Sequence, residues 1–190
     1  MEFKNDDNEE EHKMADLHTF QPFSLDEVEI NPFTKIGKDW GLISAGNKNT
    51  YNTMTVSWGG MGILWGKKVV FIFIRDSRYT KELIDQGEMF SVSFLGESYR
   101  DALNYCGSHS GKDENKFEGA GLTPAFKMST PYVDEANFVL ICHKLAKVPI
   151  TKDTFTEMGL DARWYGDKAP DHLGNYHTMY IGEIMESMAR

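Results

Sequence analysis

The hydrophobic pattern of the chain is typical of short strands rather than of long helices. Residues 68–75 (KVVFIFIR) are apolar almost without interruption, which predicts a strand covered on both faces. Residues 90–95 (FSVSFL) alternate between apolar and polar positions, as a half-buried strand does. Four more strands are predicted where β-branched and aromatic residues gather, at 39–45, 53–58, 136–148 and 177–185.

Short helices are predicted between these strands. Residues 77–86 (SRYTKELIDQ) form the clearest one, with Gly87 as a left-handed stop. Residues 98–105 predict a second helix capped by the side chain of its first residue, and 113–118 predict one more helical turn. The glycine-dense stretch 59–66 predicts backbone that bends or closely approaches another group.

Six strands interrupted by short helices, without regular strand–helix–strand alternation, predict an antiparallel β-barrel with helical insertions and not a Rossmann fold. A length of 190 residues suits one domain with a full core. Six acidic residues lie within the first eleven positions, and such a block of like charge is solvated rather than buried. We therefore predict a flexible acidic tail over residues 1–15 and a single domain over 16–190.

Composition narrows the classes of function. The formal net charge of -9 argues against nucleic acid as a partner, because proteins that bind phosphate backbones concentrate Lys and Arg. Only two cysteines occur, Cys106 and Cys142, which fits a reducing compartment better than a disulfide scaffold. There is no apolar leader and no stretch of about 20 apolar residues. We expect a cytoplasmic chain without a membrane partner.

Several common motifs are absent. Gly66 and Lys67 are followed by Lys68, so the stretch fails the Walker A pattern, which requires Ser or Thr there. The glycines at 60, 62 and 66 miss the dinucleotide-binding spacing and lead into a strand. The six histidines show no metal-binding spacing, so no metal site is predicted.

Three polar segments remain as candidates for chemistry: 52–58 (NTMTVSW), 75–80 (RDSRYT) and 106–113 (CGSHSGKD) with Lys116 beyond it. In the second, two arginines and two hydroxyls surround a helix start, where free N–H groups attract phosphate. Composition alone favours a plain capped surface helix there. The first segment is either a core strand or a backbone edge that the following glycines leave open to a flat heterocycle, and the third reads as an ordinary glycine-containing loop.

Together these segments resemble the flavin reductase-like family, and within it the flavoredoxin-type branch. The resemblance rests on an N-x-M-T-x-S-W strand, a strand ending in R-x-S-R-x-T, a C-G-x-x-S-G-[RK]-D loop and the last strand HTMYIGEI, in that order. It covers about residues 31–185. It implies a six-stranded antiparallel split β-barrel that forms a homodimer and holds FMN near the subunit interface.

The resemblance also implies which residues hold the cofactor. Met54, Thr55, Val56 and Ser57 would face the flavin ring and ribityl chain; Arg75, Ser77, Arg78 and Thr80 would take the phosphate; Ser110, Gly111, Lys112 and Lys116 would close over the cofactor; and Asn52, Trp58 and Tyr79 complete the predicted set. Lys112 stands where the branch often has arginine, so charge is kept without the forked geometry.

The expected function is an NAD(P)H-dependent flavin reductase in which bound FMN takes a hydride, because a cofactor that does the chemistry explains why no acid–base pair or nucleophile is visible. A flavoredoxin-like carrier that receives electrons from a protein donor, and a non-catalytic FMN-binding protein, are the alternatives. The sequence does not distinguish them, and it assigns no role to Cys106 or His177.

Overall fold

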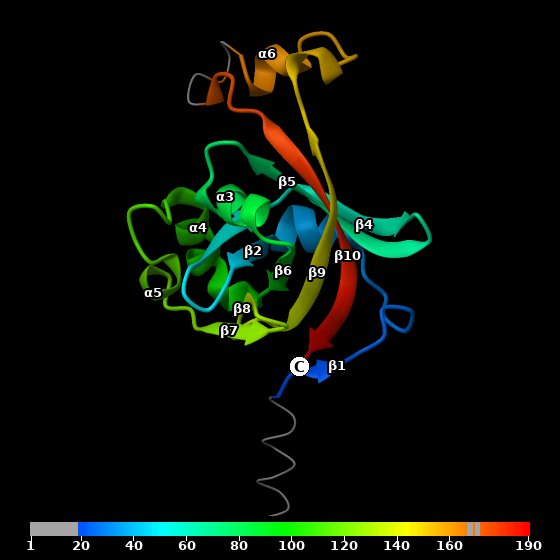
Figure 1. The fold of residues 1–190 in the computed structure, drawn as a ribbon, viewed down its shortest axis with the longest axis vertical. Coiled ribbons are helices and arrows are strands. Elements are labelled where there is room, and N and C mark those ends of the chain that lie inside the picture. Colours follow the sequence, from blue (N-terminus) through cyan, green and yellow to red (C-terminus); the bar gives the residue numbers. More distant parts are fainter. Residues whose placement is uncertain (1–18, 167–168, 170–171) are drawn as a thin grey trace, which may run out of the picture.

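The computed structural model describes residues 19–166, 169 and 172–190, so the predicted tail over 1–15 lies outside the described residues. The fold is built on one antiparallel eight-stranded sheet with short helices around it (Figure 1). Its strands are β1 (Gln21–Pro22), β2 (Gly41–Gly46), β3 (Tyr51–Val56), β4 (Gly59–Leu64), β5 (Lys67–Arg75), β6 (Met89–Phe94), β9 (Phe138–Pro149) and β10 (His177–Ala189), and a separate hairpin pairs β7 (Pro124–Lys127) with β8 (Thr130–Val133).

The two ends of this sheet are β3 and β4, although these strands follow each other in the chain. The strand order is β3-β2-β6-β9-β10-β5-β4, with β1 paired to β10. Only Ser57 and Trp58 connect β3 to β4. Buried side chains from six strands, β2, β3, β5, β6, β9 and β10, meet in a single apolar cluster, which requires the sheet to curl around it. The fold is therefore a barrel that is split between β3 and β4.

The helices lie outside the barrel and cover part of its surface. A second apolar cluster, which includes Leu103, Cys106, Phe117 and Val139, fills the space between helices α4 and α5 and the sheet. The helical elements are α2 (Pro32–Thr34), a π-helical turn (Lys35–Asp39), α3 (Tyr79–Gln86), a 3-10 turn (Glu97–Tyr99), α4 (Arg100–Ser108), α5 (Lys116–Gly119), a 3-10 turn (Lys152–Thr154) and α6 (Leu160–Trp164).

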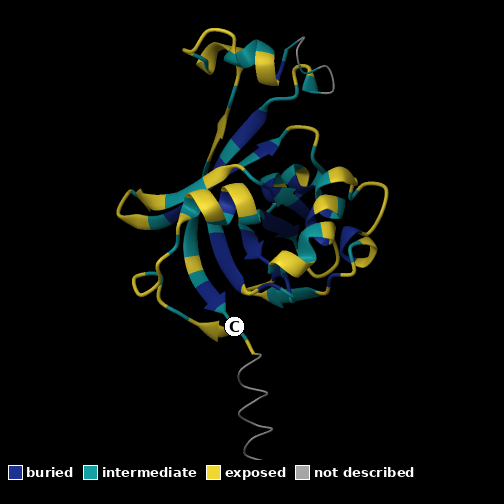
Figure 2. Cartoon of the chain, turned by 180° about the vertical axis from the view of Figure 1, so that it is seen from behind, coloured by how far each residue is buried: buried dark blue, intermediate teal, exposed yellow. Residues whose placement is uncertain are grey.

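The long strands β9 and β10 pair along most of their length and carry the segment between them away from the barrel (Figure 1). This segment contains α6, and its described residues are mostly exposed or half-buried (Figure 2). Within β10, Gly182 lies directly against the ring of Phe90, and a Cβ at this position would overlap that ring. Glycine is therefore needed where β10 passes over the barrel core.

The predicted fold class, a mainly β antiparallel split barrel with short helical insertions, is confirmed, and all six predicted strands are present within a few residues. The sheet has more strands than six because β1 and β4 join it. The glycine-dense stretch, expected to bend, forms strand β4 because its backbone pairs with β5 over Gly59 to Leu64. Burial along β5 alternates, with Ile72 and Ile74 buried and Phe73 half-buried, so β5 is not fully covered on both faces.

Two predicted helix signals are wrong. Gly87 is extended, with φ -103°, and not left-handed. The end of α3 is held instead by the ammonium of Lys144, which donates to the carbonyls of Ile84 and Gly87 at 2.6 Å each. Ser98 does not cap a helix, because a 3-10 turn precedes α4 and Tyr99 occupies the N-cap position.

Candidate functional site

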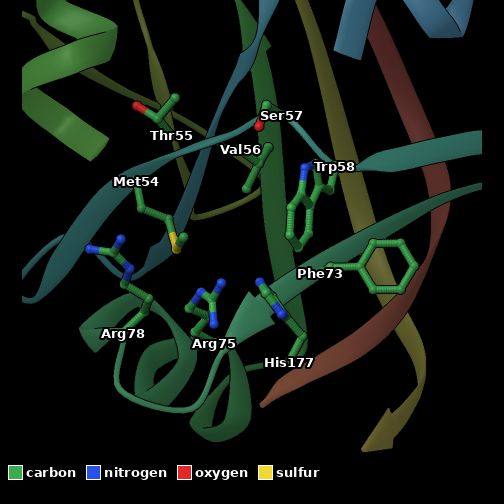
Figure 3. A pocket seen from close by; sticks show the side chains of 9 residues that line it. All are labelled: Met54, Thr55, Val56, Ser57, Trp58, Phe73, Arg75, Arg78 and His177. Atoms are coloured by element: carbon green, nitrogen blue, oxygen red, sulfur yellow. The ribbon is translucent and has the colours of Figure 1, made fainter. Parts of the chain in front are cut away.

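An open hollow of about 170 Å³ lies where the end of β3, the end of β5 and the start of β10 meet (Figure 3). Two of the three predicted segments, 52–58 and 75–80, supply most of its lining. The lining residues are Met54, Thr55, Val56, Ser57, Trp58, Phe73, Arg75, Arg78 and His177. The fold therefore brings together the strand predicted to face a flavin ring and both arginines predicted to bind phosphate.

Strand β3 forms one wall of the hollow. Met54 and Val56 are buried against the barrel core, while the Thr55 hydroxyl donates to the carbonyl of Leu103 in α4 at 2.5 Å. In the described sheet β3 pairs only with β2, so the backbone groups on its other edge are left without a strand partner. Such an edge offers N–H donors and carbonyl acceptors to the heteroatoms of a planar ligand.

The two arginines approach the hollow in different ways. The Arg75 guanidinium donates to the carbonyl of Asn175 at 3.0 Å and lies 5.4 Å from the centre of the Tyr165 ring. Arg78 is at the N-cap of α3 and makes no side-chain capping bond. Among the residues that the structure describes, neither guanidinium has a carboxylate within 4.0 Å.

Positive charge is therefore concentrated here without a matching acid. Burial lowers the pKa of Arg75, and the charge of Arg78 lowers it further. The charge of Arg78 also acts on Lys116 and His177. An anion that enters the hollow would relieve this repulsion, because an opposite charge nearby favours each cation.

The predicted hydroxyl ligands have partners within the protein. Ser77 is exposed, and its hydroxyl accepts from the side-chain amide of Asn175 at 2.8 Å. Thr80 is buried, and its hydroxyl accepts from the Asn52 amide at 2.9 Å. Tyr79, the first residue of α3, is half-buried against the barrel core. These four predicted residues lie around the helix start and not in the lining itself.

The third predicted segment does not line the hollow. The Ser110 hydroxyl accepts from the backbone N–H of Lys112 at 3.2 Å, and the Lys112 ammonium pairs with Glu82 of α3 at 2.5 Å. Gly111 packs so closely on Asn52 that a Cβ there would overlap its amide. The third segment thus contacts helix α3 and Asn52 of β3 without lining the hollow.

Lys116 is buried, with 2 % of its surface exposed. Its ammonium donates to the carbonyl of Cys106 near the end of α4 at 2.5 Å, and burial lowers its pKa to about 8. Lys116 therefore does not reach over the hollow, although it lies close enough to Arg78 for the two charges to interact.

Two lining residues, Phe73 and His177, were absent from the predicted site. His177 begins β10 directly opposite Arg75 of β5, and its Nδ1 lies 2.6 Å from the hydroxyl of Tyr165. Burial lowers the pKa of His177 to about 4, with the charge of Arg75 next in importance, so its imidazole is neutral at pH 7. The role of His177 was not predictable, because it depends on strand register. Phe73 lies two residues before Arg75 on β5, so the alternation of side chains along a strand could have placed it on the same face.

The site offers binding groups rather than a nucleophile. Burial raises the pKa of the Cys106 thiol to about 11 and raises that of Cys142 further, so neither is a thiolate at neutral pH. No group of three His, Cys, Asp or Glu side chains suited to a metal ion occurs within the described ranges.

None of the helices in the described part of the chain has the length and apolar character of a membrane span.

Three solved structures share this fold and are distant in sequence. Flavoredoxin from Methanosarcina acetivorans is 18% identical, with a TM-score of 0.62 over 86% of this chain and 75% of that chain. Flavoredoxin of Desulfovibrio vulgaris (Miyazaki F) is 21% identical, with a TM-score of 0.61 over 90% and 77%. An FMN-binding domain of a flavin reductases-like enzyme from Shewanella baltica OS155 is 15% identical, with a TM-score of 0.60 over 90% and 77%.

The family itself is shown by sequence. No curated protein matches the chain significantly. The model of the flavin reductase like domain, however, matches residues 34–189, which is most of the chain and includes every residue that lines the hollow. This match supports FMN as the cofactor. The chain belongs to the flavin reductase-like family.

Proposed function

We propose that the hollow binds FMN and that Arg78 takes its phosphate. The observation that carries this proposal is the pair of arginines at the hollow without a carboxylate partner in the described structure. A phosphate dianion supplies the missing charge, and the forked guanidinium suits its oxygens. Arg78 is the stronger candidate, because Arg75 already donates to Asn175.

The rest of the hollow fits the flavin portion. The free edge of β3 along 54–56 can hydrogen bond to ring nitrogens and carbonyls, and the aromatic side chains of Trp58 and Phe73 provide apolar walls (Figure 3). In flavoproteins the protein binds and orients the cofactor, which agrees with a site that contains binding groups and no thiolate.

We further propose that the protein is an NAD(P)H-dependent flavin reductase. Bound FMN supplies the redox chemistry, since it can accept a hydride from a nicotinamide. The hollow is open, and Trp58 at its rim remains 41% exposed. A nicotinamide could therefore reach the hollow and pack on an exposed aromatic surface without a nucleotide-binding domain of its own. The protein would contribute position and a neutral His177, not a proton-transfer pair.

Anaerobic reduction tests this activity directly. The purified full chain is loaded with FMN, NADH or NADPH is added without oxygen, and flavin absorbance is followed. Bleaching within seconds by either nucleotide is the result expected of a reductase. If only dithionite bleaches the flavin, the reductase proposal is wrong. If the dithionite-reduced flavin passes its electrons to a protein acceptor, the protein is a carrier. If it passes electrons to no protein acceptor, the protein is a non-catalytic FMN-binding protein.

We also propose that the chain forms a homodimer. Exposed apolar side chains gather beside the β4–β5 hairpin, at Phe33 (85% exposed), Ile63 (70%) and Trp65 (64%). Ile63 also lines a groove together with Val28 and Met61. Apolar surface of this kind usually marks an interface. Light scattering at micromolar concentration should give about 43 kDa, twice the 21.7 kDa of one chain, and about 22 kDa would contradict the dimer.

A further inference from the structure

Tyr165 stands out in the segment between β9 and β10. Helix α6 itself contains no buried residue, yet Tyr165 immediately after it is only 6% exposed. Its ring stacks on Tyr176 at 4.6 Å and lies 5.4 Å from the Arg75 guanidinium. Tyr165 is thus a buried contact between this mostly exposed segment and the candidate site, beside the hydrogen bonds that Asn175 makes to Arg75 and Ser77.

The hydroxyl of Tyr165 makes one hydrogen bond in the described structure, to Nδ1 of His177 at 2.6 Å. Burial raises the pKa of Tyr165, so the phenol keeps its proton. No other described group accepts that proton, and donation from it to Nδ1 requires Nδ1 to be unprotonated. A neutral imidazole with an unprotonated Nδ1 carries its hydrogen on Nε2.

The surroundings of His177 oppose a positive charge. Arg75 faces it from the end of β5, Arg78 from the start of α3 and His172 from the segment before β10, and each lowers the pKa of His177 in addition to the larger effect of burial. The rings of Trp58 and Tyr165 contact it on other sides. No acidic group acts on it among the residues described.

We propose that Tyr165 is a positioning residue that holds His177 in the Nε2–H tautomer, so that a neutral N–H donor faces the hollow. His177 lines the hollow and its Nδ1 is occupied by Tyr165, which leaves Nε2 as the nitrogen available to a ligand. Such a donor suits a carbonyl oxygen or an unprotonated ring nitrogen. The inference concerns the pocket of the proposed function, but its test needs no flavin.

The sign of one pKa change distinguishes the two possible directions of the bond. If Tyr165 donates to Nδ1, it stabilises the neutral imidazole, and Tyr165→Phe should raise the pKa of His177 by about one pH unit, the worth of one ordinary hydrogen bond. If instead Nδ1–H donates to Tyr165, the bond favours the cation, and the same substitution should lower the pKa. Titration of the His177 ring protons by NMR in the full chain measures this change.

Tyr176→Phe is the matched control, because Tyr176 stacks on Tyr165 while its own hydroxyl donates to Asp161 at 2.7 Å. This variant should leave the pKa of His177 unchanged. Nitrogen chemical shifts of the unaltered chain should also show hydrogen on Nε2 and not on Nδ1. Hydrogen on Nδ1, or a pKa that falls or stays constant in Tyr165→Phe, would overturn the proposal.

The same samples separate this inference from the proposed function. The pKa of His177 is titrated with and without flavin, and FMN affinity is measured in parallel on the same variants. A chain that does not bind FMN but shows the expected rise in the pKa of His177 would refute the cofactor assignment and leave the role of Tyr165 standing. A chain that binds FMN but shows no rise in the pKa of His177 in Tyr165→Phe would refute the role of Tyr165 and leave the cofactor assignment standing.

Discussion

The side-chain amide of Asn52 in β3 donates to the hydroxyl of Thr80 in α3 at 2.9 Å, and both groups are buried. Gly111 packs on the other side of the same amide. This asparagine of the first polar segment therefore contacts both of the other two segments that the sequence singles out. The bond joins the start of β3, two residues before the part that lines the hollow, to the start of α3, where Arg78 lies.

Replacing Asn52 should affect both stability and binding. Asn52→Ala leaves the Thr80 hydroxyl buried without its donor and opens space beside Gly111, so we expect a loss of about 1–3 kcal/mol in the free energy of unfolding. FMN affinity should fall as well, because β3 and α3 lose their fixed relation. Urea unfolding and equilibrium flavin binding measure the two effects. Asn49→Ala, an exposed asparagine in the preceding turn, is the control, and equal results for both variants would contradict this role.

Lys116 predicts a pH dependence of FMN binding. Its pKa in the ligand-free protein is lowered to about 8 by burial, so Lys116 is neutral at higher pH. A phosphate dianion nearby would favour the charged lysine. FMN affinity should therefore be nearly constant between about pH 7 and 8, where the phosphate is a dianion, and fall as the pH rises through 8 to 9.

Binding titrations of FMN and riboflavin at pH 7, 8 and 9 test this dependence. Riboflavin has no phosphate, so its affinity should change little over that range. Lys116→Met should remove the decline for FMN. A decline that persists unchanged in this variant would assign the titration to another group.

Acid should destabilise the fold through His177. Its pKa is lowered from 6.5 to about 4 in the folded state by burial, so between these values the unfolded chain takes up a proton that the folded chain does not. Stability is then full above about pH 6.5 and falls as the pH decreases towards 4, by up to about 3 kcal/mol. Urea unfolding at pH 7 and pH 5 should show a smaller loss for His177→Gln than for the unaltered chain. The exposed His109→Gln is the control, and a loss that is the same in all three proteins would exclude His177 as the cause.

The hydrophobic pattern of the sequence predicted most of the strands. The β-branched and aromatic runs gave β5, β6, β9 and β10 within a few residues, because side chains in strands must fit a pleated, half-buried surface. The glycines of β4 misled the prediction, because pairing with β5 outweighs the weak strand preference of glycine. Gly87 misled it as well, because a distant residue, Lys144, caps α3.

The site was predictable only where its residues are close in sequence. The residues at 54–58 and the arginines at 75 and 78 line the hollow together. Phe73, two residues before Arg75 on β5, was missed although strand alternation places the two on one face. His177 joins the site only through the pairing of β10 with β5, which no short motif encodes. Lys116 was expected over the cofactor and is instead buried against Cys106, because the sequence does not reveal which face of a short helix turns inward.

The central claim is that the hollow binds FMN through a phosphate held by Arg78, and paired affinities test it most directly. FMN and riboflavin are titrated against the unaltered chain, Arg78→Ala and Arg100→Ala. Arg100 packs on Trp40 and is not part of the hollow, so its replacement controls for the loss of an arginine as such. Arg78→Ala should weaken FMN by about 1.5–3 kcal/mol, roughly ten- to a hundredfold, and leave riboflavin affinity nearly unchanged. An unchanged affinity for FMN, or an equal loss for both flavins, would contradict the account.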